Sequence, residues 1–421
     1  MYYYCYTYKY NMRKFVAIFP GQGSQFVGMN KSIYDEYKIV RDTIQEAEDV
    51  TGIKLKDMCF NGPLSALSKP ENAHVAILAF GVAAFRVFVS ETGCLPEFCA
   101  GHSLGEYTAL VCAGVIKFSD ALKLVQLRSK LSVEIQNETD GGMTIIDGIE
   151  SSVVESVCRE QQEKGKRVYV SCYNSKTQTA ISGYSPDVME AEGLIRDKSG
   201  IITPLFGSSP FHCPLMESGK EKLNNIMADM EFSQARYPVM SNYLGRPYES
   251  VAEVRGGLLQ HLTNPVKWTT IIEYFYHKGI DSVIDFSPKN IFDNMLSEYD
   301  GFTTFCFGIR SERENLLDTL NNEEYAKHKT NLVSKALLAV VSTPNLNFNE
   351  DEYKSGVVEK YNKIVEINNS VETEKAELTN EVKKEVFNLL TSILETKKVD
   401  ISEIMWWKNK ILEETASVYE V

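Results

Sequence analysis

The sequence lacks the features that define several large classes of protein. Its nine cysteines include no C-x-x-C pair, which is against a zinc site or a disulfide framework and is typical of reduced thiols in a cytoplasmic enzyme. Its net charge is −13, whereas a nucleic-acid-binding protein needs a basic face for the phosphates. We therefore expect no metal and no nucleic-acid partner. Five cysteines stand in apolar surroundings and are expected to fill the core: Cys59, Cys94, Cys99, Cys112 and Cys306.

Long apolar runs are also missing. No run reaches the ~18 residues that a membrane span needs, so we expect no membrane association. Residues 1–14 form an N-terminal tail that is rich in tyrosine and has no small-residue cleavage site, so they are not a signal peptide. Met12 stands just before the first apolar strand. We expect translation to start there and residues 1–11 to be mobile or packed only superficially.

The chain does contain a nucleophile-elbow pattern. Residues 101–107 read Gly-His-Ser-Leu-Gly-Glu-Tyr, a G-x-S-x-G motif centred on Ser103. A short strand at 96–100 and an apolar helix at 108–115 provide the strand–turn–helix context that the motif requires. In that geometry the N–H of Leu104 and the positive end of the helix dipole face a developing oxyanion. A chance match occurs in roughly one chain in seven of this length, so the motif needs companions.

The order of apolar segments predicts an α/β core interrupted by a small α+β insert. Residues 15–19 are a continuous apolar run, typical of a buried parallel strand. The Gly-rich loop that follows is neither a P-loop nor a dinucleotide-binding loop. The expected core helices lie at 31–50, 75–90, 120–133, 215–231, 250–261 and 269–278, and two late strands lie at 282–286 and 303–307. The second helix is too apolar for a surface helix and is expected to lie against the sheet.

Residues 141–213 have the pattern of a separate small unit. Short strands are expected at 143–146, 167–172, 179–182 and 201–205, with helices at 153–164 and 187–198. The resulting strand–helix–strand–strand–helix–strand order is that of a ferredoxin-like insert. It divides the core into 15–140 and 214–310.

The residues from 311 to 421 differ in character. They are poor in Gly, rich in Glu, Lys and Asn, and strongly helical in pattern. One helix carries an apolar stripe, and the next begins at a cap formed by Asp400 or Ser402. The stripe is a packing face, on the core or within a small helical bundle, or alternatively a partner-docking surface. Its members are Leu378, Val382, Val386, Leu389, Leu390, Ile393 and Leu394.

Histidine is scarce, which narrows the search for the general base that a serine nucleophile needs. Of six histidines, His277 and His328 stand in polar helical stretches and are expected at the surface. His212 is flanked by Pro210 and Pro214, so a rigid turn holds it as a base would be held. Arg128 lies on an apolar helix, where it either pairs with a substrate carboxylate or makes an ion pair at the helix edge.

Seven motifs together make the sequence similar to the malonyl-CoA:acyl-carrier-protein transacylases, including free-standing acyltransferases that serve polyketide synthases in trans. The motifs follow the family's order and spacing from about residue 15 to 310. They are Phe-Pro-Gly-Gln-Gly-Ser-Gln (19–25), Gly-His-Ser-Leu-Gly-Glu-Tyr (101–107), Gln-Leu-Arg (126–128), Tyr-Asn-Ser (173–175), Ile-Ser-Gly (181–183), Pro-Phe-His-Cys-Pro-Leu-Met (210–216) and Asn-Pro-Val-Lys-Trp (264–268).

The resemblance implies a fold and a set of roles. The fold is an α/β-hydrolase-like large subdomain with a ferredoxin-like small subdomain inserted, here followed by a helical extension at 311–421. Ser103 would be the nucleophile and His212 its base, oriented by the backbone carbonyl of His261. The remaining implied site residues are Gln22 and Leu104 for the oxyanion hole, Arg128 for the malonyl carboxylate, and Asn174, Phe211, His102 and His74 for the pocket.

The resemblance also implies the reaction. Malonyl would pass from malonyl-CoA to Ser103 and then to the phosphopantetheine thiol of an acyl carrier protein, by a ping-pong mechanism without a cofactor, in a cytoplasmic monomer. Phe211 before the base goes with malonyl rather than methylmalonyl, because a bulky ring leaves little room beside the α-carbon.

Three departures from the family pattern accompany these matches. His74 and His261 stand where the family often has Gln, which could alter the pH profile or admit water. Ser287-Pro288-Lys289 replaces Gly-Pro-Gly, and the extension at 311–421 is additional. The extension favours specialised metabolism over fatty-acid synthesis.

Three alternatives stay open at this point. A trans-acting acyl hydrolase of the same fold would be expected to lack Arg128. An ordinary α/β-hydrolase esterase would need a late acid–His pair, and a docking subunit without activity would not need Ser103, His212 and Arg128.

Overall fold

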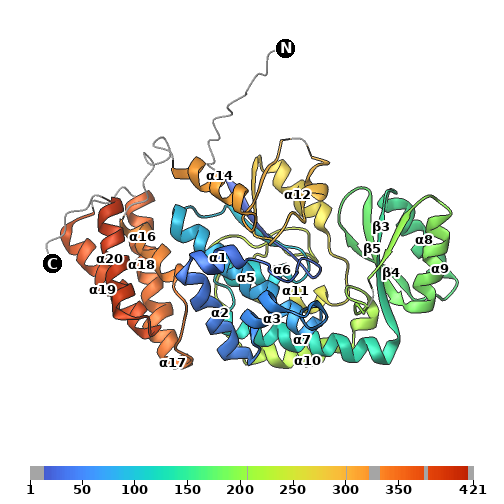
Figure 1. Cartoon of the computed structure of the whole chain (residues 1–421), viewed down its shortest axis with the longest axis horizontal. Helices are drawn as coiled ribbons and strands as arrows, with labels where there is room; N and C mark the ends of the chain where they lie inside the picture. Colours follow the sequence, from blue (N-terminus) through green and yellow to red (C-terminus); the bar gives the residue numbers. More distant parts are fainter. Residues whose placement is uncertain (1–13, 206, 300, 322–331, 374–377, 416–421) are drawn as a thin grey trace, which may run out of the picture.

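The computed structural model describes residues 14–205, 207–299, 301–321, 332–373 and 378–415. The expectations for residues 1–11 and for His328 therefore lie outside the described residues. Within these ranges the chain forms three parts in a row: the helical extension, the α/β core and the small insert (Figure 1).

A parallel four-stranded sheet forms the centre of the core. Its strands are β1 (Phe15–Phe19), β2 (Phe98–Gly101), β7 (Ser282–Asp285) and β8 (Thr303–Cys306), in the order β2-β1-β7-β8. Every residue of β1 is buried, as the continuous apolar run predicts for a strand covered on both faces. The strands at 15–19, 282–286 and 303–307 are thus confirmed to within a residue.

Helices cover both faces of this sheet. Those preceding the insert are α1 (Lys31–Glu36), α2 (Lys38–Thr51), α3 (Leu55–Asn61), α4 (Leu64–Leu67), α5 (Pro70–Thr92), α6 (Gly105–Cys112) and α7 (Phe118–Thr139). Those following it are η1 (Pro214–Met216), α10 (Gly219–Ala228), α11 (Val251–His261), α12 (Trp268–His277) and α13 (Asp293–Leu296). The expected single helix at 31–50 is wrong, because Tyr37 is extended (φ −110°, ψ 124°). The expected helix at 215–231 is likewise a short turn followed by α10.

Helix α5 corrects the expectation about apolar runs. Among the described residues it is long and apolar enough to cross a membrane, with a mean hydropathy of 1.9 over an 18-residue window. That window is 94% buried inside the protein. The ring of Phe85 on α5 packs edge-on against Phe19 of β1 and Phe286 after β7. The helix is therefore the central core helix, and it lies against the sheet as expected.

The insert has the expected ferredoxin-like topology. Its elements are β3 (Gly141–Asp147), α8 (Ser151–Glu163), β4 (Val168–Tyr173), β5 (Gln178–Tyr184), α9 (Ser185–Arg196) and β6 (Ile201–Pro204). The sheet order is β4-β5-β3-β6, and every neighbouring pair is antiparallel. The N–H of Tyr173 donates to the carbonyl of Val266, which ties the edge strand β4 to the core. The domain boundaries at 140 and 213 stay predictions.

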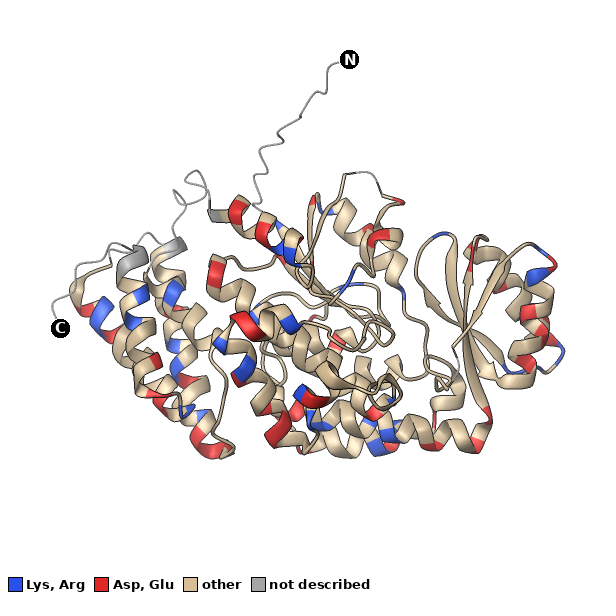
Figure 2. Cartoon of the chain, viewed as in Figure 1, with Lys and Arg blue, Asp and Glu red and all other residues tan. Residues whose placement is uncertain are grey.

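The described part of the extension consists of helices joined by short loops. Its helices are α14 (Arg310–Asn321), α16 (Leu332–Ser342), α17 (Glu350–Tyr353), η2 (Lys354–Val358), α18 (Glu359–Thr373), α19 (Asn380–Thr396) and α20 (Ile401–Thr415). The apolar stripe on α19 packs inside this bundle, where Val386, Leu390 and Ile393 are fully buried. Acidic and basic residues are interspersed along these helices (Figure 2). The packing-face interpretation is confirmed for α19.

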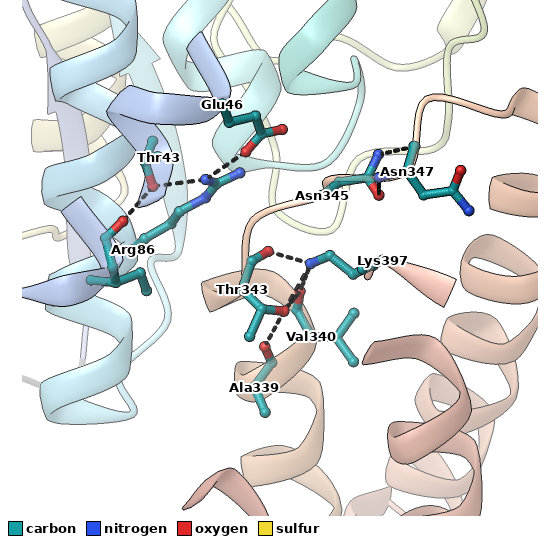
Figure 3. Close-up of polar contacts among 10 residues, drawn as sticks. Thr43, Glu46, Arg86, Ala339, Val340, Thr343, Asn345, Asn347 and Lys397 are labelled. Atoms are coloured by element: carbon teal, nitrogen blue, oxygen red, sulfur yellow. Dashed lines mark hydrogen bonds and ion pairs between the residues drawn. The ribbon is translucent and has the colours of Figure 1, made fainter. Parts of the chain in front are cut away.

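Buried polar groups of the core and of the extension lie close together where the two parts meet (Figure 3). On the core side, Arg86 of α5 donates to Thr43 and pairs with Glu46 of α2 at 3.2 Å. On the extension side, Lys397 after α19 donates to the carbonyl of Val340 at 2.8 Å. Arg86, Glu46 and Lys397 are each more than nine-tenths buried. The extension is therefore packed as a continuous part of the molecule.

The burial of the cysteines and of His277 follows the sequence-based expectations with one exception. Cys59, Cys99, Cys112 and Cys306 are buried, whereas Cys94 is only half-buried. His277 is exposed, as expected.

Candidate active site

The elbow forms where β2 passes into α6. Ser103 adopts a left-handed conformation (φ 51°), which costs free energy for a non-glycine residue and is typical of a nucleophile elbow. A Cβ at Gly101 would lie 1.9 Å from the carbonyl carbon of Gly105, and a Cβ at Gly105 would lie 2.2 Å from the carbonyl oxygen of Phe19. Only glycine fits at both positions, which explains the G-x-S-x-G spacing.

Ser103 and His212 meet across the join between core and insert. Ser103 Oγ lies 2.7 Å from His212 Nε2, and His212 Nδ1 lies 2.7 Å from the carbonyl oxygen of His261. The carbonyl can only accept, so Nδ1 carries the proton and Nε2 accepts from the serine hydroxyl. Burial, with a further contribution from the cationic Arg128, lowers the pKa of His212 to about 3. The ring is therefore neutral and able to take the serine proton.

Arg128 is fully inside the protein. Its side chain is 2% exposed, and its guanidinium carbon lies 4.2 Å from the ring centroid of Phe211. Its Nε and Nη2 atoms have no hydrogen-bond partner among the described residues. The ion pair at a helix edge, left open by the sequence, is therefore wrong. A buried guanidinium with unpaired N–H groups is costly unless an anion binds it, so Arg128 is suited to a carboxylate.

Asn174 links the insert to the elbow. The imidazole Nε2 of His102 lies 2.7 Å from Asn174 Oδ1, and burial lowers the pKa of His102. The neutral ring donates from Nε2 to this oxygen. The ring of Trp268 packs edge-on against His102 with 5.4 Å between centroids. His102 therefore positions the elbow and does not reach Ser103 as a second base.

His74 holds the Gln22 side chain. Its Nε2 lies 2.9 Å from the side-chain oxygen Oε1 of Gln22, and its Nδ1 contacts the hydroxyl of Ser129. Gly21 packs directly on the elbow, since a Cβ there would lie 2.7 Å from the carbonyl oxygen of His102.

The two N–H groups expected in the oxyanion hole are free to act there. Within the described ranges, the backbone N–H groups of Gln22 and Leu104 donate no hydrogen bond. Their role as an oxyanion hole stays a prediction.

Sequence reasoning missed Asn242. Its Oδ1 accepts from the backbone N–H of Ser103 at 2.7 Å, and its Nδ2 donates to the carbonyl of Gly101 at 2.7 Å. The side chain thus spans the elbow from a loop far along the sequence. The one sequence signal is its position after the apolar pair Val239-Met240, where a polar side chain needs buried partners.

Similarity to proteins of known family agrees with this geometry. A family model described as an acyl transferase domain matches residues 16–298, more than half of the chain. The chain belongs to the acyl transferase domain family. Two malonyl CoA-acyl carrier protein transacylases are among its relatives. That of Bacillus subtilis is 32% identical over 390 residues, covering 92% of this chain and 98% of the relative. That of Escherichia coli K12 is 36% identical over 282 residues, covering 66% of this chain and 91% of the relative.

Solved structures resemble this acyl transferase at the level of the fold. A malonyl CoA-acyl carrier protein transacylase from Coxiella burnetii superimposes with a TM-score of 0.70 at 31% identity, covering 73% of this chain and 98% of that one. A malonyl-transacylase in complex with its type II polyketide synthase acyl-carrier protein has a TM-score of 0.70 at 32% identity, covering 72% and 99%.

The extension of this acyl transferase is not unique to it. An alignment that covers 92% of the chain must include most of the residues from 311 on. The Bacillus subtilis relative therefore shares this part, whereas the Escherichia coli relative matches only 66% of the chain.

Proposed function

We propose that this acyl transferase moves malonyl from malonyl-CoA to the phosphopantetheine thiol of an acyl carrier protein. The observation that carries the proposal is the pairing of a Ser103–His212 hydrogen bond with, beside the same imidazole, a buried Arg128 whose Nε and Nη2 have no hydrogen-bond partner among the described residues. A serine and a neutral histidine are what acyl transfer requires. The guanidinium selects an acyl group that ends in a carboxylate. The names of the relatives support the same reaction.

In the first half-reaction, Ser103 Oγ attacks the thioester carbonyl carbon while its proton passes to His212 Nε2. The N–H groups of Gln22 and Leu104 stabilise the negative oxygen of the tetrahedral intermediate. The carbon–sulfur bond then breaks, and the CoA thiolate leaves with the proton from His212. The product is a malonyl ester on Ser103. In the second half-reaction, the carrier thiol gives its proton to His212 and attacks the ester, and Ser103 leaves as the alkoxide and is reprotonated.

Arg128 and Phe211 determine which acyl group is accepted. The guanidinium binds the free carboxylate of malonyl, and the ring of Phe211 covers one side of the guanidinium. The same ring limits the space beside the α-carbon. Malonyl is therefore favoured over acetyl, which has no carboxylate, and over methylmalonyl, which is larger.

The surroundings of the reaction belong to the same proposal. The enzyme acts as a cytoplasmic monomer, without cofactor, membrane or nucleic acid, and its partners are a CoA thioester and an acyl carrier protein of polyketide or fatty-acid synthesis. The extension shared with the Bacillus subtilis relative sets this chain apart from the Escherichia coli one. The similar malonyl-transacylase in complex with a type II polyketide synthase carrier protein supports specialised metabolism.

Intact mass after mixing with malonyl-CoA or acetyl-CoA tests the proposal. We expect a malonyl adduct on wild type, none on Ser103→Ala, and transfer of the adduct to an added holo carrier protein. Arg128→Ala should reduce malonyl loading about 100-fold, because a charge-assisted pair contributes about 3 kcal/mol, and leave acetyl loading unchanged or higher. Arg159→Ala, an exposed arginine on α8, is the control. Loss of the adduct to water without transfer would instead indicate an acyl hydrolase.

A further inference from the structure

Behind the dyad, the side chain of His261 lies between His212 and a buried carboxylate. The rings of His212 and His261 are in contact, with centroids 4.7 Å apart and planes tilted by 31°. On its other side, His261 Nδ1 is 3.6 Å from Glu106 Oε2. His261 is 1% exposed and Glu106 is 0% exposed. The order in space is thus Ser103, His212, His261, Glu106.

Two hydrogen bonds hold the carboxylate of Glu106 in place, one to each oxygen. The hydroxyl of Tyr248 donates to Glu106 Oε1, and the backbone N–H of Asn242 donates to Oε2 at 3.1 Å. Asn242 is the residue whose side chain also holds the N–H of Ser103. The contacts therefore close a ring that leads from Ser103 through His212, His261, Glu106 and Asn242 back to Ser103.

The other titratable groups that act on this pair come from several elements and turns. Arg128 of α7 and Tyr107 of α6 lie beside Glu106, and Tyr248 contacts it from the loop before α11. Arg128, His212 and His102 act on His261. Burial is the main cause that lowers the pKa of His261 well below its usual value, and the nearby titratable groups His212, Arg128 and His102 lower it further. Burial also raises the pKa of Glu106 to about 7.

The proposed reaction creates a need for a negative charge at this place. When His212 takes the proton of Ser103, an imidazolium forms in a buried site that already holds Arg128. The carbonyl of His261 accepts its Nδ1–H but carries no net charge, unlike the acid of a Ser–His–Asp triad. Both ring nitrogens of His261 are buried and lack a hydrogen-bond partner within the described residues. A neutral imidazole there is free to be polarised by the carboxylate next to it.

We propose that Glu106 and the imidazole of His261 are positioning residues of the dyad: ionised Glu106 supplies, through His261, the negative charge that offsets the imidazolium formed on His212. The only proton that moves is the one from Ser103 Oγ to His212 Nε2, and Glu106 stays ionised throughout. The inference rests on the proposed function, because it concerns the acylation step.

The test is the pH dependence of single-turnover malonylation of Ser103, followed by quenched intact mass from pH 5.5 to 8.5. The malonylation rate of wild type should rise with pH, with an inflection near pH 7, where Glu106 ionises. Glu106→Gln should lose the inflection and be about tenfold slower above pH 7, which corresponds to a change of one unit in the pKa of His212. His261→Gln keeps the backbone carbonyl, so the dyad stays formed, but the rise with pH should shrink.

A double-mutant cycle separates this role from a structural one. If Glu106 acts through His261, the double variant is no slower than Glu106→Gln alone. His277→Gln, at an exposed position of α12, is the control and should follow wild type. Superimposable pH profiles for all variants, or equal losses at every pH that multiply in the double variant, would overturn the inference.

Two further measurements distinguish failure of this inference from failure of a variant to fold or of the proposed function. If Glu106→Gln does not fold, selective ¹⁵N-histidine labelling of wild type, which has six histidines, decides: the His261 signal must shift with an inflection near pH 7, and a flat signal overturns the inference. If wild type forms no malonyl adduct at any pH, the proposed function fails. If wild type loads normally and only the pH profiles disagree, this inference alone fails.

Discussion

The backbone N–H of Ser103 donates a 2.7 Å hydrogen bond to the side-chain oxygen of Asn242, which is 139 residues away in the sequence. The side-chain Nδ2 of Asn242 donates to the backbone carbonyl of Gly101 on the other side of the turn. One side chain therefore holds both ends of a strained elbow whose left-handed serine would otherwise be free to relax.

Asn242→Ala should remove this support. The N–H of Ser103 and the carbonyl of Gly101 would lose their partners in a buried place, which costs about 1–3 kcal/mol of stability. Malonylation should slow by about 10–100-fold, because a misplaced nucleophile is costly. Thermal unfolding and the acylation rate measure the two effects, with Asn315→Ala, on the exposed face of α14, as control. An acylation rate equal to that of wild type would show that the elbow holds itself.

Phe211→Leu should relax the choice of acyl group. The ring covers the guanidinium of Arg128 at 4.2 Å and fills the space expected beside the α-carbon. A smaller side chain should raise the ratio of methylmalonyl to malonyl loading by about 10–100-fold, the usual range for one carbon in an apolar pocket. Competition between the two CoA esters, read by intact mass, gives this ratio. Phe348→Leu, at a 54% exposed ring, should leave it unchanged, and an unchanged ratio in Phe211→Leu would place the pocket elsewhere.

His74→Gln should weaken the dependence of stability on acid. Burial, and then the charge of Arg128, lowers the pKa of His74 from its ordinary value of 6.5 to about 3 in the folded protein. A lowered pKa means that the unfolded chain binds the proton more tightly, so stability is lost as the pH falls below about 6.5.

Each such histidine costs about 2 kcal/mol between pH 7.5 and pH 5. The drop in the free energy of unfolding over this range should therefore be about 2 kcal/mol smaller in His74→Gln than in wild type. Urea denaturation at the two pH values measures it. His277→Gln should lose as much stability as wild type, and an equal loss in His74→Gln would contradict the prediction.

Lys397→Met should loosen the extension. The ammonium donates to Val340 O at 2.8 Å, to the hydroxyl of Thr343 at 2.9 Å and to the carbonyl of Thr343. Its charge also stabilises the buried carboxylate of Glu46 across the joint. Removing it should cost about 2–4 kcal/mol, because buried acceptors and a carboxylate lose a partner.

Limited proteolysis and thermal unfolding both report on this joint. Residues 332–415 should become cleavable in Lys397→Met before the core does. Lys398→Met changes the exposed neighbouring residue in the same way and should behave as wild type. Equal protection of the two variants would mean that apolar packing alone attaches the bundle.

Elements whose signals are local can be predicted from the amino-acid sequence alone. The elbow is predictable because two glycines and a serine at fixed spacing are required by close backbone contacts. The ferredoxin-like insert follows from the order of short strands and helices, and β1 from one uninterrupted apolar run. His212 was identified because six histidines leave few bases, and because its turn and the family motifs single it out.

Contacts between segments that are distant in the sequence become known only from the folded chain. The hydrogen bond from the N–H of Ser103 to Asn242 has no local sequence signature, because its partners come from separate elements. The same is true of the position of His261 between His212 and Glu106. The location of α5 also depends on the assembled fold. Its composition suits a membrane span, but the sheet and helices that surround it make it a core helix. The side chain of Arg128 could have faced water or the pocket, and the packing of Phe211 against it decided between them. Periodicity reports which face of an element is buried, whereas the identity of the group it meets is set by the assembled fold.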